Sequence, residues 1–155
     1  MADPGEKKQG LAILETLIVS VIMFVLAAFS YISLVSFRDQ QILNNGVGSA
    51  LALIQDARSR TLASRYNAQY GINFQTDRLI LFQGASYPGL TIEEMPLDAH
   101  LQIIEVQLQG GGTSLIFERL SGTTFNEGTL QIGIKDSQTA SSTLRINAAG
   151  LVSVE

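Results

Sequence analysis

The sequence contains no cysteine and only one histidine, His100, among its 155 residues. The absence of cysteine excludes disulfide bonds, thiolate metal sites and cysteine nucleophiles. Any serine-based triad would have to use His100, and no Gly-x-Ser-x-Gly elbow occurs in the chain. We therefore expect no enzyme activity, no metal site and no cofactor.

Charged residues are also scarce, at 15% of the chain against 46% hydrophobic residues. Such an apolar composition excludes intrinsic disorder, and the length fits one domain plus an appendage. The formal net charge is −4, with the arginines scattered, which is not the charge pattern of a nucleic-acid-binding protein. Nucleic acid is therefore not the expected partner.

Several short motifs are better explained as ordinary surface or turn segments than as catalytic or ligand-binding sites. His100 follows Asp98 in a predicted surface loop, and Glu93-Glu94 is interpreted as a solvated acidic patch. Gly46-Val-Gly48 lacks the third glycine and the preceding strand of a dinucleotide-binding loop. Gly110-Gly-Gly112 lies between two predicted strands, so we interpret it as a hairpin tip.

The long apolar run stands near the N-terminus. Between Leu11 and Phe37 the only residue charged at neutral pH is Glu15. Roughly 20 apolar residues span a bilayer, so this segment is long enough for a transmembrane helix. A polar leader, residues 1–10, carries Lys7 and Lys8 just before the run. The positive-inside rule then places the leader in the cytoplasm and the remainder of the chain outside.

The order of these segments differs from that of a secretory signal, in which cleavage follows the apolar run. A carboxylate at mid-bilayer costs about 2.5 to 3.5 kcal/mol, so Glu15 is a candidate functional residue. The alternative is a glutamate that snorkels to the cytoplasmic face. Cleavage after Gly10 would make Leu11 the first residue of the mature chain and Glu15 the fifth.

The N-terminus resembles the prepilin cleavage and methylation motif, in the run Lys7-Lys8-Gln-Gly10 followed by Leu11-Ala-Ile-Leu-Glu15. In that family a membrane prepilin peptidase cuts after the glycine and methylates the new N-terminal amine. The resemblance implies cleavage between Gly10 and Leu11, N-methylation of Leu11 and a filament-assembly role for Glu15. Residues 11–14 depart from the commonest form of the motif, which has Phe, Thr, Leu and Ile there.

The physical basis of this motif is a pair of opposite charges. A free N-terminal amine stays mostly cationic at neutral pH. In a bundle of helices, the amine of Leu11 and the Glu15 carboxylate of a neighbour would attract by about 4 kcal/mol at 4 Å and an effective dielectric of 20. Leaving one buried charge unpaired would cost about 3 to 5 kcal/mol, so the pair selects the axial register.

The periodicity predicts that the helix continues as an amphipathic half over residues 38–66. Its apolar stripe contains Val47, Leu51, Ile54, Ala57 and Leu62. The weak point is the segment 44–48, because each of its two glycines costs roughly 1 kcal/mol in a helix. We expect a bend or a locally melted turn there, or alternatively a loop between two helices.

From residue 67 the period changes to two and predicts a β-rich domain, residues 67–155. Six or seven short strands are expected, in the segments 70–74, 79–82, 101–108, 114–117, 130–134, 144–146 and 151–154. A phase slip at Ile103-Ile104 indicates a bulge or a strand buried on both faces, and residues 84–100 receive no assignment. The predicted fold class is α+β, with a long N-terminal helix packed on a small antiparallel β-sheet or sandwich.

The β-rich domain resembles the H-type minor pseudopilin (GspH/FimT) family. The matching features are the Ala57-Arg58 pair, the Ile116-Phe117 strand leading to Ser121-Gly122, and the Thr143–Gly150 strand and turn. The resemblance implies a pilin-like fold and a low-copy structural subunit of a type IV pilus or type II secretion filament. It also implies three kinds of partner: the prepilin peptidase, other pilins or pseudopilins, and the inner-membrane assembly platform.

The implied location is the cytoplasmic (inner) membrane, crossed once, and afterwards the pilus or pseudopilus. The sequence does not choose between a type IV pilus, a type II secretion system and a DNA-uptake system. The alternative function is a membrane-tethered module that binds DNA or a surface ligand. Arg58, Arg60 and Arg65 lie close together along the predicted helix, whereas the C-terminal strands carry only Arg145.

Overall fold

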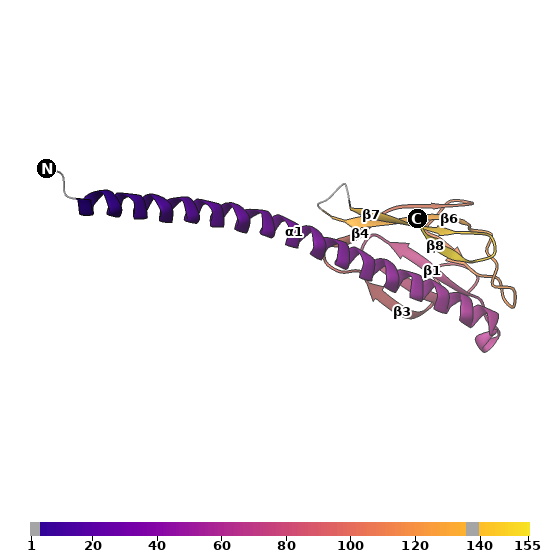
Figure 1. The fold of residues 1–155 in the computed structure, drawn as a ribbon. Coiled ribbons are helices and arrows are strands. Elements are labelled where there is room, and N and C mark those ends of the chain that lie inside the picture. Colours follow the sequence, from indigo (N-terminus) through magenta and orange to yellow (C-terminus); the bar gives the residue numbers. More distant parts are fainter. Residues whose placement is uncertain (1–3, 136–139) are drawn as a thin grey trace. The chain divides into compact units, whose positions relative to one another are not determined.

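The structure is a computed structural model that describes residues 4–135 and 140–155, with side chains described for residues 14–28, 37–135 and 140–155. One long helix, α1 (Pro4–Leu62), precedes all the strands (Figure 1). The chain divides into two units, Met1–Arg38 and Asp39–Glu155. We call them the N-terminal unit and the head unit.

The head unit contains the second part of α1, a short 3-10 helix η1 (Arg65–Asn67) and two four-stranded sheets. The first sheet has the order β3-β2-β1-β5, and the second has the order β4-β6-β7-β8, with all pairs antiparallel. The strands are β1 (Tyr70–Gln75), β2 (Arg78–Gln83), β3 (Leu90–Pro96), β4 (Leu101–Leu108), β5 (Ser114–Ile116), β6 (Gly128–Ile134), β7 (Ser141–Ile146) and β8 (Val152–Val154). The predicted α+β class is confirmed.

A single hydrophobic core joins the helix to both sheets. It includes Ile54 and Ala57 of α1, Ile72 of β1, and Leu130 of β6, each fully buried. Figure 1 shows the second part of α1 running along the strands that supply this core. Burial of these side chains, at roughly 25 cal/mol per Å² of apolar surface, is the main term that holds the helix on the sheets.

The buried stripe of α1 is wider than the sequence predicted. Val47, Ile54 and Ala57 are buried as expected, whereas Leu51 is half-buried and Leu62 is exposed. The structure adds four buried positions, Leu43, Ala50, Leu53 and Thr61. A helix that contacts two sheets needs a broader apolar face than one that contacts a single surface.

The helix does not break at residues 44–48. The backbone is helical throughout, so the loop between two helices and the melted turn were wrong. A Cβ on Gly46 would overlap Cδ1 of the fully buried Leu101, whereas a Cβ on Gly48 would meet nothing within 4 Å. Gly46 therefore permits the close approach of α1 to β4.

The two glycines give a matched pair of variants. Gly48→Ala should raise the free energy of unfolding by about 1 kcal/mol, because alanine favours the helix. Gly46→Ala should lose this gain, because forcing a methyl group against Leu101 costs about 1 to 3 kcal/mol. Thermal denaturation of both variants in the same detergent measures the difference. Equal stabilisation by both would show that Gly46 is not required for packing.

The seven predicted strand segments all lie on observed strands, with ends shifted by one to three residues in most of them. The predicted irregularity at Ile103-Ile104 is confirmed, because the β4–β6 register shifts between Ile103 and Glu105. The missed strand is β3, whose residues are exposed or half-buried throughout, so no alternating pattern marks it. The hairpin assigned to Gly110–Gly112 was wrong, because β4 and β5 belong to different sheets and this segment crosses between them.

Candidate functional site

The predicted processing and assembly residues all lie on α1. Its backbone is helical at Lys7, Lys8, Gly10, Leu11 and Glu15. The side chains of the first four lie outside the described residues, so the structure places only their backbone. Glu15 is described, and its side chain is exposed.

The N-terminal unit exposes apolar side chains on every face of the helix. Residues 14–28 are all exposed, and Phe24 is 82% and Met23 66% exposed. A helix that is apolar all round requires an apolar environment around its whole circumference. Among the described residues, no helix reaches the length and hydropathy needed to cross a membrane.

Glu15 is the only ionisable residue in this exposed apolar segment, 14–28. The hydroxyl of Ser20, by contrast, donates a hydrogen bond of 2.7 Å to the carbonyl oxygen of Thr16 one turn earlier. Such a bond satisfies a hydroxyl inside a helix without an outside partner. A carboxylate accepts hydrogen bonds only, and a helix interior has no unused N–H groups to offer it. Glu15 is therefore the residue of this segment for which an apolar environment is most costly.

In the head unit, the three motifs that carried the family resemblance meet at one side chain. Nε of Arg58 on α1 donates to the carbonyl oxygen of Gly122, and Nη2 donates to that of Ala149, each at 3.1 Å. A Cβ on Gly150 would collide with the carbonyl oxygen of Gly122 and lie 3.1 Å from Nε of Arg58. We call Arg58, Gly122, Ala149 and Gly150 the Arg58 clasp. It joins the last turns of α1 to the β5–β6 and β7–β8 loops.

Removal of the clasp guanidinium should destabilise the head unit. Hydrogen bonds to charged groups contribute about 1.5 to 3 kcal/mol, so Arg58→Ala should lower the free energy of unfolding by about that amount. Arg145→Ala is the control, because Arg145 forms only an exposed ion pair with Glu155, at 3.2 Å. Chemical denaturation of both variants checks this. If the free energy of unfolding falls by the same small amount in both variants, the Arg58 clasp does not stabilise the head unit.

The remaining candidate groups form local surface pairs. Nδ1 of His100 lies 2.9 Å from Oδ1 of Asp98, with both side chains exposed. Arg78 pairs with Asp77 at 3.0 Å and with Glu94 at 3.3 Å. The hydrogen bond from Arg78 lowers the pKa of Asp77 below its ordinary value. Across residues 4–135 and 140–155, no three His, Asp or Glu side chains form a group that could hold a metal ion.

The arginines proposed for the DNA-binding alternative do not act as a group. Arg60 pairs with Asp56 at 2.7 Å, and Arg58 is engaged in the clasp. Arg65 is exposed on η1. Two of the three guanidinium groups thus serve contacts inside the head unit.

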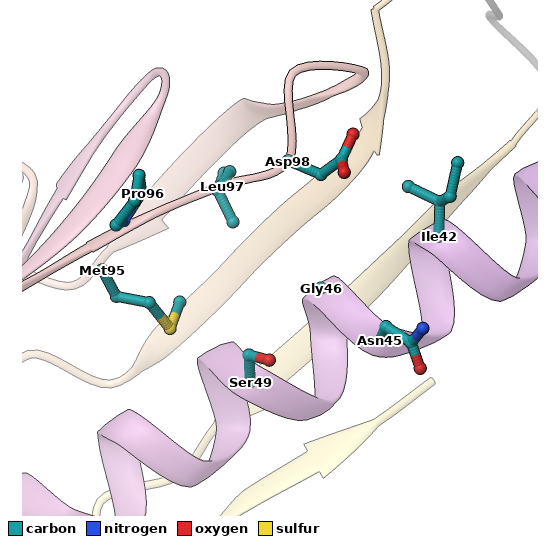
Figure 2. Close-up of a pocket in the computed structure, with 8 residues that line it drawn as sticks. All are labelled: Ile42, Asn45, Gly46, Ser49, Met95, Pro96, Leu97 and Asp98. Carbon is teal, nitrogen blue, oxygen red and sulfur yellow. The ribbon is translucent and has the colours of Figure 1, made fainter.

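A pocket in the head unit was missed at the sequence level. It has a volume of about 220 Å³ and lies between α1 and the end of β3, where Met95 and Leu97 face Gly46 and Ser49 (Figure 2). Its other lining residues are Ile42, Asn45, Pro96 and Asp98. Half of the lining residues fall in segment 84–100, which received no assignment from the sequence. The alternation of Met95 with Leu97 was the signal that could have indicated an apolar face there.

A long N-terminal helix packed on antiparallel sheets is the fold of type IV pilin-like proteins. Two solved crystal structures of the type IV minor pilin FimU from Pseudomonas aeruginosa share it. The form in space group P65 is 20% identical, with a TM-score of 0.56, and the match covers 73% of this chain and 92% of that one. The P21 form is 18% identical, with a TM-score of 0.60, covering 77% and 92%.

No protein-family model matches the chain, and no curated protein matches it. At identities of 18 to 20%, the likeness to FimU establishes the fold alone. The pilin-like fold that the sequence resemblance implied is confirmed, whereas the roles of Gly10, Leu11 and Glu15 stay predictions.

Proposed function

We propose that this protein is a structural subunit, a minor pilin or pseudopilin, of a filament of the type IV pilus kind. The observation that carries the proposal is the apolar stretch of α1 over residues 14–28, exposed on every face and bearing one carboxylate, that of Glu15, on a chain with a pilin-like fold. Such a helix needs an apolar environment on all sides. A bilayer and the core of a helical filament both provide one.

The proposed processing follows the N-terminal motif. Prepilin peptidase cuts between Gly10 and Leu11 on the cytoplasmic side, where Lys7 and Lys8 hold the leader, and methylates Leu11. Residues 11–37 then anchor the chain in the inner membrane with the head unit outside the cytoplasm. The support is the predominantly apolar sequence of residues 11–37, in which Glu15 is the one residue charged at neutral pH.

Assembly moves the same helix from lipid into the filament core. There the amine of Leu11 and the Glu15 carboxylate of a neighbouring subunit neutralise each other, with an attraction of about 4 kcal/mol. The partners are other pilins and the inner-membrane assembly platform. The description of FimU as a type IV minor pilin favours a type IV pilus over a type II secretion filament.

The test is recovery of the protein in sheared surface filaments of cells that carry the assembly machinery. An epitope-tagged chain should appear in the sheared fraction, and deletion of the prepilin peptidase should keep it at full length in the membrane. A cytoplasmic protein probed on the same blot controls for lysis. Recovery in the membrane fraction alone, with the peptidase present, would overturn the proposal.

The alternative, a membrane-tethered module that binds DNA or a surface ligand, has weaker support. Its basis was the group of Arg58, Arg60 and Arg65 along the predicted helix. Arg65 lies instead on η1, and the other two make contacts inside the head unit. A gel shift with the full chain in detergent at low salt tests DNA binding, because phosphate contacts are strongest there. The absence of a shift would remove the DNA-binding form of this alternative.

A further inference from the structure

A second pocket of the head unit lies between the last turns of α1 and the start of β8. One wall consists of Gln55, Arg58, Ser59 and Leu62 of α1, and the other of residues 150–152. Its volume is about 380 Å³, within the roughly 300 to 1,000 Å³ of pockets that bind ligands. We call it the β8 groove. It shares no residue with the pocket between α1 and β3.

β8 is the outermost strand of its sheet, so one of its edges has no partner strand. The backbone N–H of Glu155 donates to the carbonyl oxygen of Thr143 at 2.9 Å, which makes these two a hydrogen-bonded pair of the β7–β8 ladder. Bonded and non-bonded pairs alternate in an antiparallel ladder, so Ser153 is the next bonded residue. The N–H and C=O groups of Val152 and Val154 therefore point away from β7. Val152 also lines the β8 groove, so this free edge begins there.

The edge of β8 lacks the features that discourage further pairing at two other sheet edges. β3 carries Glu93, Glu94 and Pro96, and its pairing with β2 contains a register shift. β4 carries Glu105 and the register shift beside it. Charges, prolines and bulges of this kind protect edge strands from added strands. The β8 segment 152–154 contains none of them, so its edge can accept another strand.

The β8 groove also carries an uncompensated positive charge. Arg58 is the only charged residue in its walls. Nε and Nη2 of Arg58 donate to the two backbone carbonyl groups of the clasp, whereas Nη1 makes no hydrogen bond or ion pair among the described residues. Other arginines of the head unit are paired, Arg60 with Asp56 at 2.7 Å and Arg145 with Glu155 at 3.2 Å. A carboxylate brought in by a ligand would therefore find a free donor in the groove.

We propose that the β8 groove binds an extended segment of another protein that carries an aspartate or glutamate. The segment adds to the second sheet as a strand beside β8, and its backbone pairs with the free N–H and C=O groups of Val152 and Val154. Its carboxylate accepts hydrogen bonds from Arg58, and an apolar side chain contacts Leu62 and Leu151, which are both exposed. Addition of a strand to a free sheet edge is a recurring mode of peptide recognition.

The occupant is a peptide because the groove combines two kinds of contact. β8 offers backbone donors and acceptors at the spacing of a strand, which another extended backbone matches. β8 has only three residues, so this pairing supplies few hydrogen bonds, and contacts with α1 have to supply the remainder. Among those contacts, Arg58 selects an acidic residue by charge. The inference goes beyond the proposed function, because it requires the head unit but no filament.

The ligand chemistry is tested with random heptapeptides, each fused through its C-terminus to a phage coat protein and selected on the full chain in non-ionic detergent micelles. Enriched peptides should contain an Asp or Glu among β-branched or aromatic residues. A synthetic peptide of an enriched sequence, blocked at both ends, should bind about tenfold more weakly when its acidic residue is replaced by the matching amide. No enrichment, equal binding of the amide peptide, or binding that needs a free C-terminus would overturn the proposal.

Two proline variants test whether the peptide pairs with β8. Val154→Pro removes an N–H from the free edge and breaks no bond to β7, at a position where edge strands tolerate proline. It should weaken peptide binding at least about tenfold. The matched control is Glu94→Pro on β3, because the bond from Leu97 N–H to Asp77, at 2.9 Å, places Glu94 on that strand's free edge. Equal binding by both variants would show that β8 is not the docking edge.

Amide hydrogen exchange locates the contact without any substitution. In nuclear magnetic resonance spectra of the full chain in micelles, the N–H groups of Val152 and Val154 should exchange rapidly without peptide. With saturating peptide they should exchange at least about tenfold more slowly, whereas the N–H of Ser153, already bonded to β7, should change little. Unchanged exchange at Val152 and Val154, or new protection along β3 or β4 instead, would overturn the proposal.

Discussion

Glu15→Ala is expected to remove the protein from sheared filaments while leaving membrane insertion and cleavage after Gly10 intact. Insertion should not suffer, because the change removes a charge that costs about 2.5 to 3.5 kcal/mol at mid-bilayer. In the filament, the amine of Leu11 in the neighbouring subunit would be buried without its partner. That loss is about 3 to 5 kcal/mol per contact, roughly a hundred- to several-thousand-fold in affinity.

The matched control is Glu105→Ala, which removes an exposed carboxylate from β4 of the head unit. This variant should enter filaments at the level of the unmodified protein. Quantitative blots of membrane and sheared fractions measure both. Filament entry of Glu15→Ala at control levels would refute the assembly role of this residue.

The second large effect is expected at Gly150, in the Arg58 clasp. Gly150→Ala should lower the free energy of unfolding by about 2 to 5 kcal/mol. Its φ of +71° costs an L-residue about 1 to 2 kcal/mol. The new Cβ would also collide with the carbonyl oxygen of Gly122, and overpacking of this kind costs about 1 to 3 kcal/mol.

Gly111→Ala separates the two contributions. Gly111 has a similar φ of +77°, but a Cβ there would meet nothing within 4 Å. This variant should therefore lose only the conformational part, about 1 to 2 kcal/mol. Urea denaturation of both, followed by circular dichroism, gives the comparison. Equal losses would mean that the close contact of Gly150 with Gly122 contributes nothing to stability.

The sequence predicted those elements whose signal is local. The apolar run from Leu11 to Phe37 and the alternation from Tyr70 onwards define the helix and most strands, because each pattern matches the period of one element. β3 escaped because its seven residues are exposed or half-buried, with Glu93 and Glu94 in its centre. Such a strand is held by backbone pairing with β2, and backbone pairing leaves little trace in side-chain pattern.

Contacts between distant segments could not be predicted. From the sequence, Gly46 was interpreted as a point where the helix breaks, because glycine has a low helix propensity. The same glycine can instead permit close packing, but this is recognised only when its neighbour in space is known. That neighbour, Leu101, lies more than fifty residues further along the chain. The sequence likewise singled out Arg58, Gly122 and Gly150 separately, by resemblance. Only the fold shows that one guanidinium group joins them.

The candidate functional residues likewise include a local motif, which the sequence reveals, and contacts between distant segments, which it does not. Gly10, Leu11 and Glu15 belong to one short motif, which the sequence displays completely. The pocket combines residues of α1 with a segment far along the chain. No spacing rule relates Ile42 to Met95, so the pocket could be found only in three dimensions.

The account depends on a new cationic chain end that forms when the leader is removed. Mass spectrometry of the N-terminal peptide of the protein isolated from cells tests this directly. We expect a mature chain that begins at Leu11, with one added methyl group on its amine. A chain that still begins at Met1 would contradict the account, because the nitrogen of Leu11 would then stay in a peptide bond and could not pair as an amine with Glu15 of a neighbouring subunit.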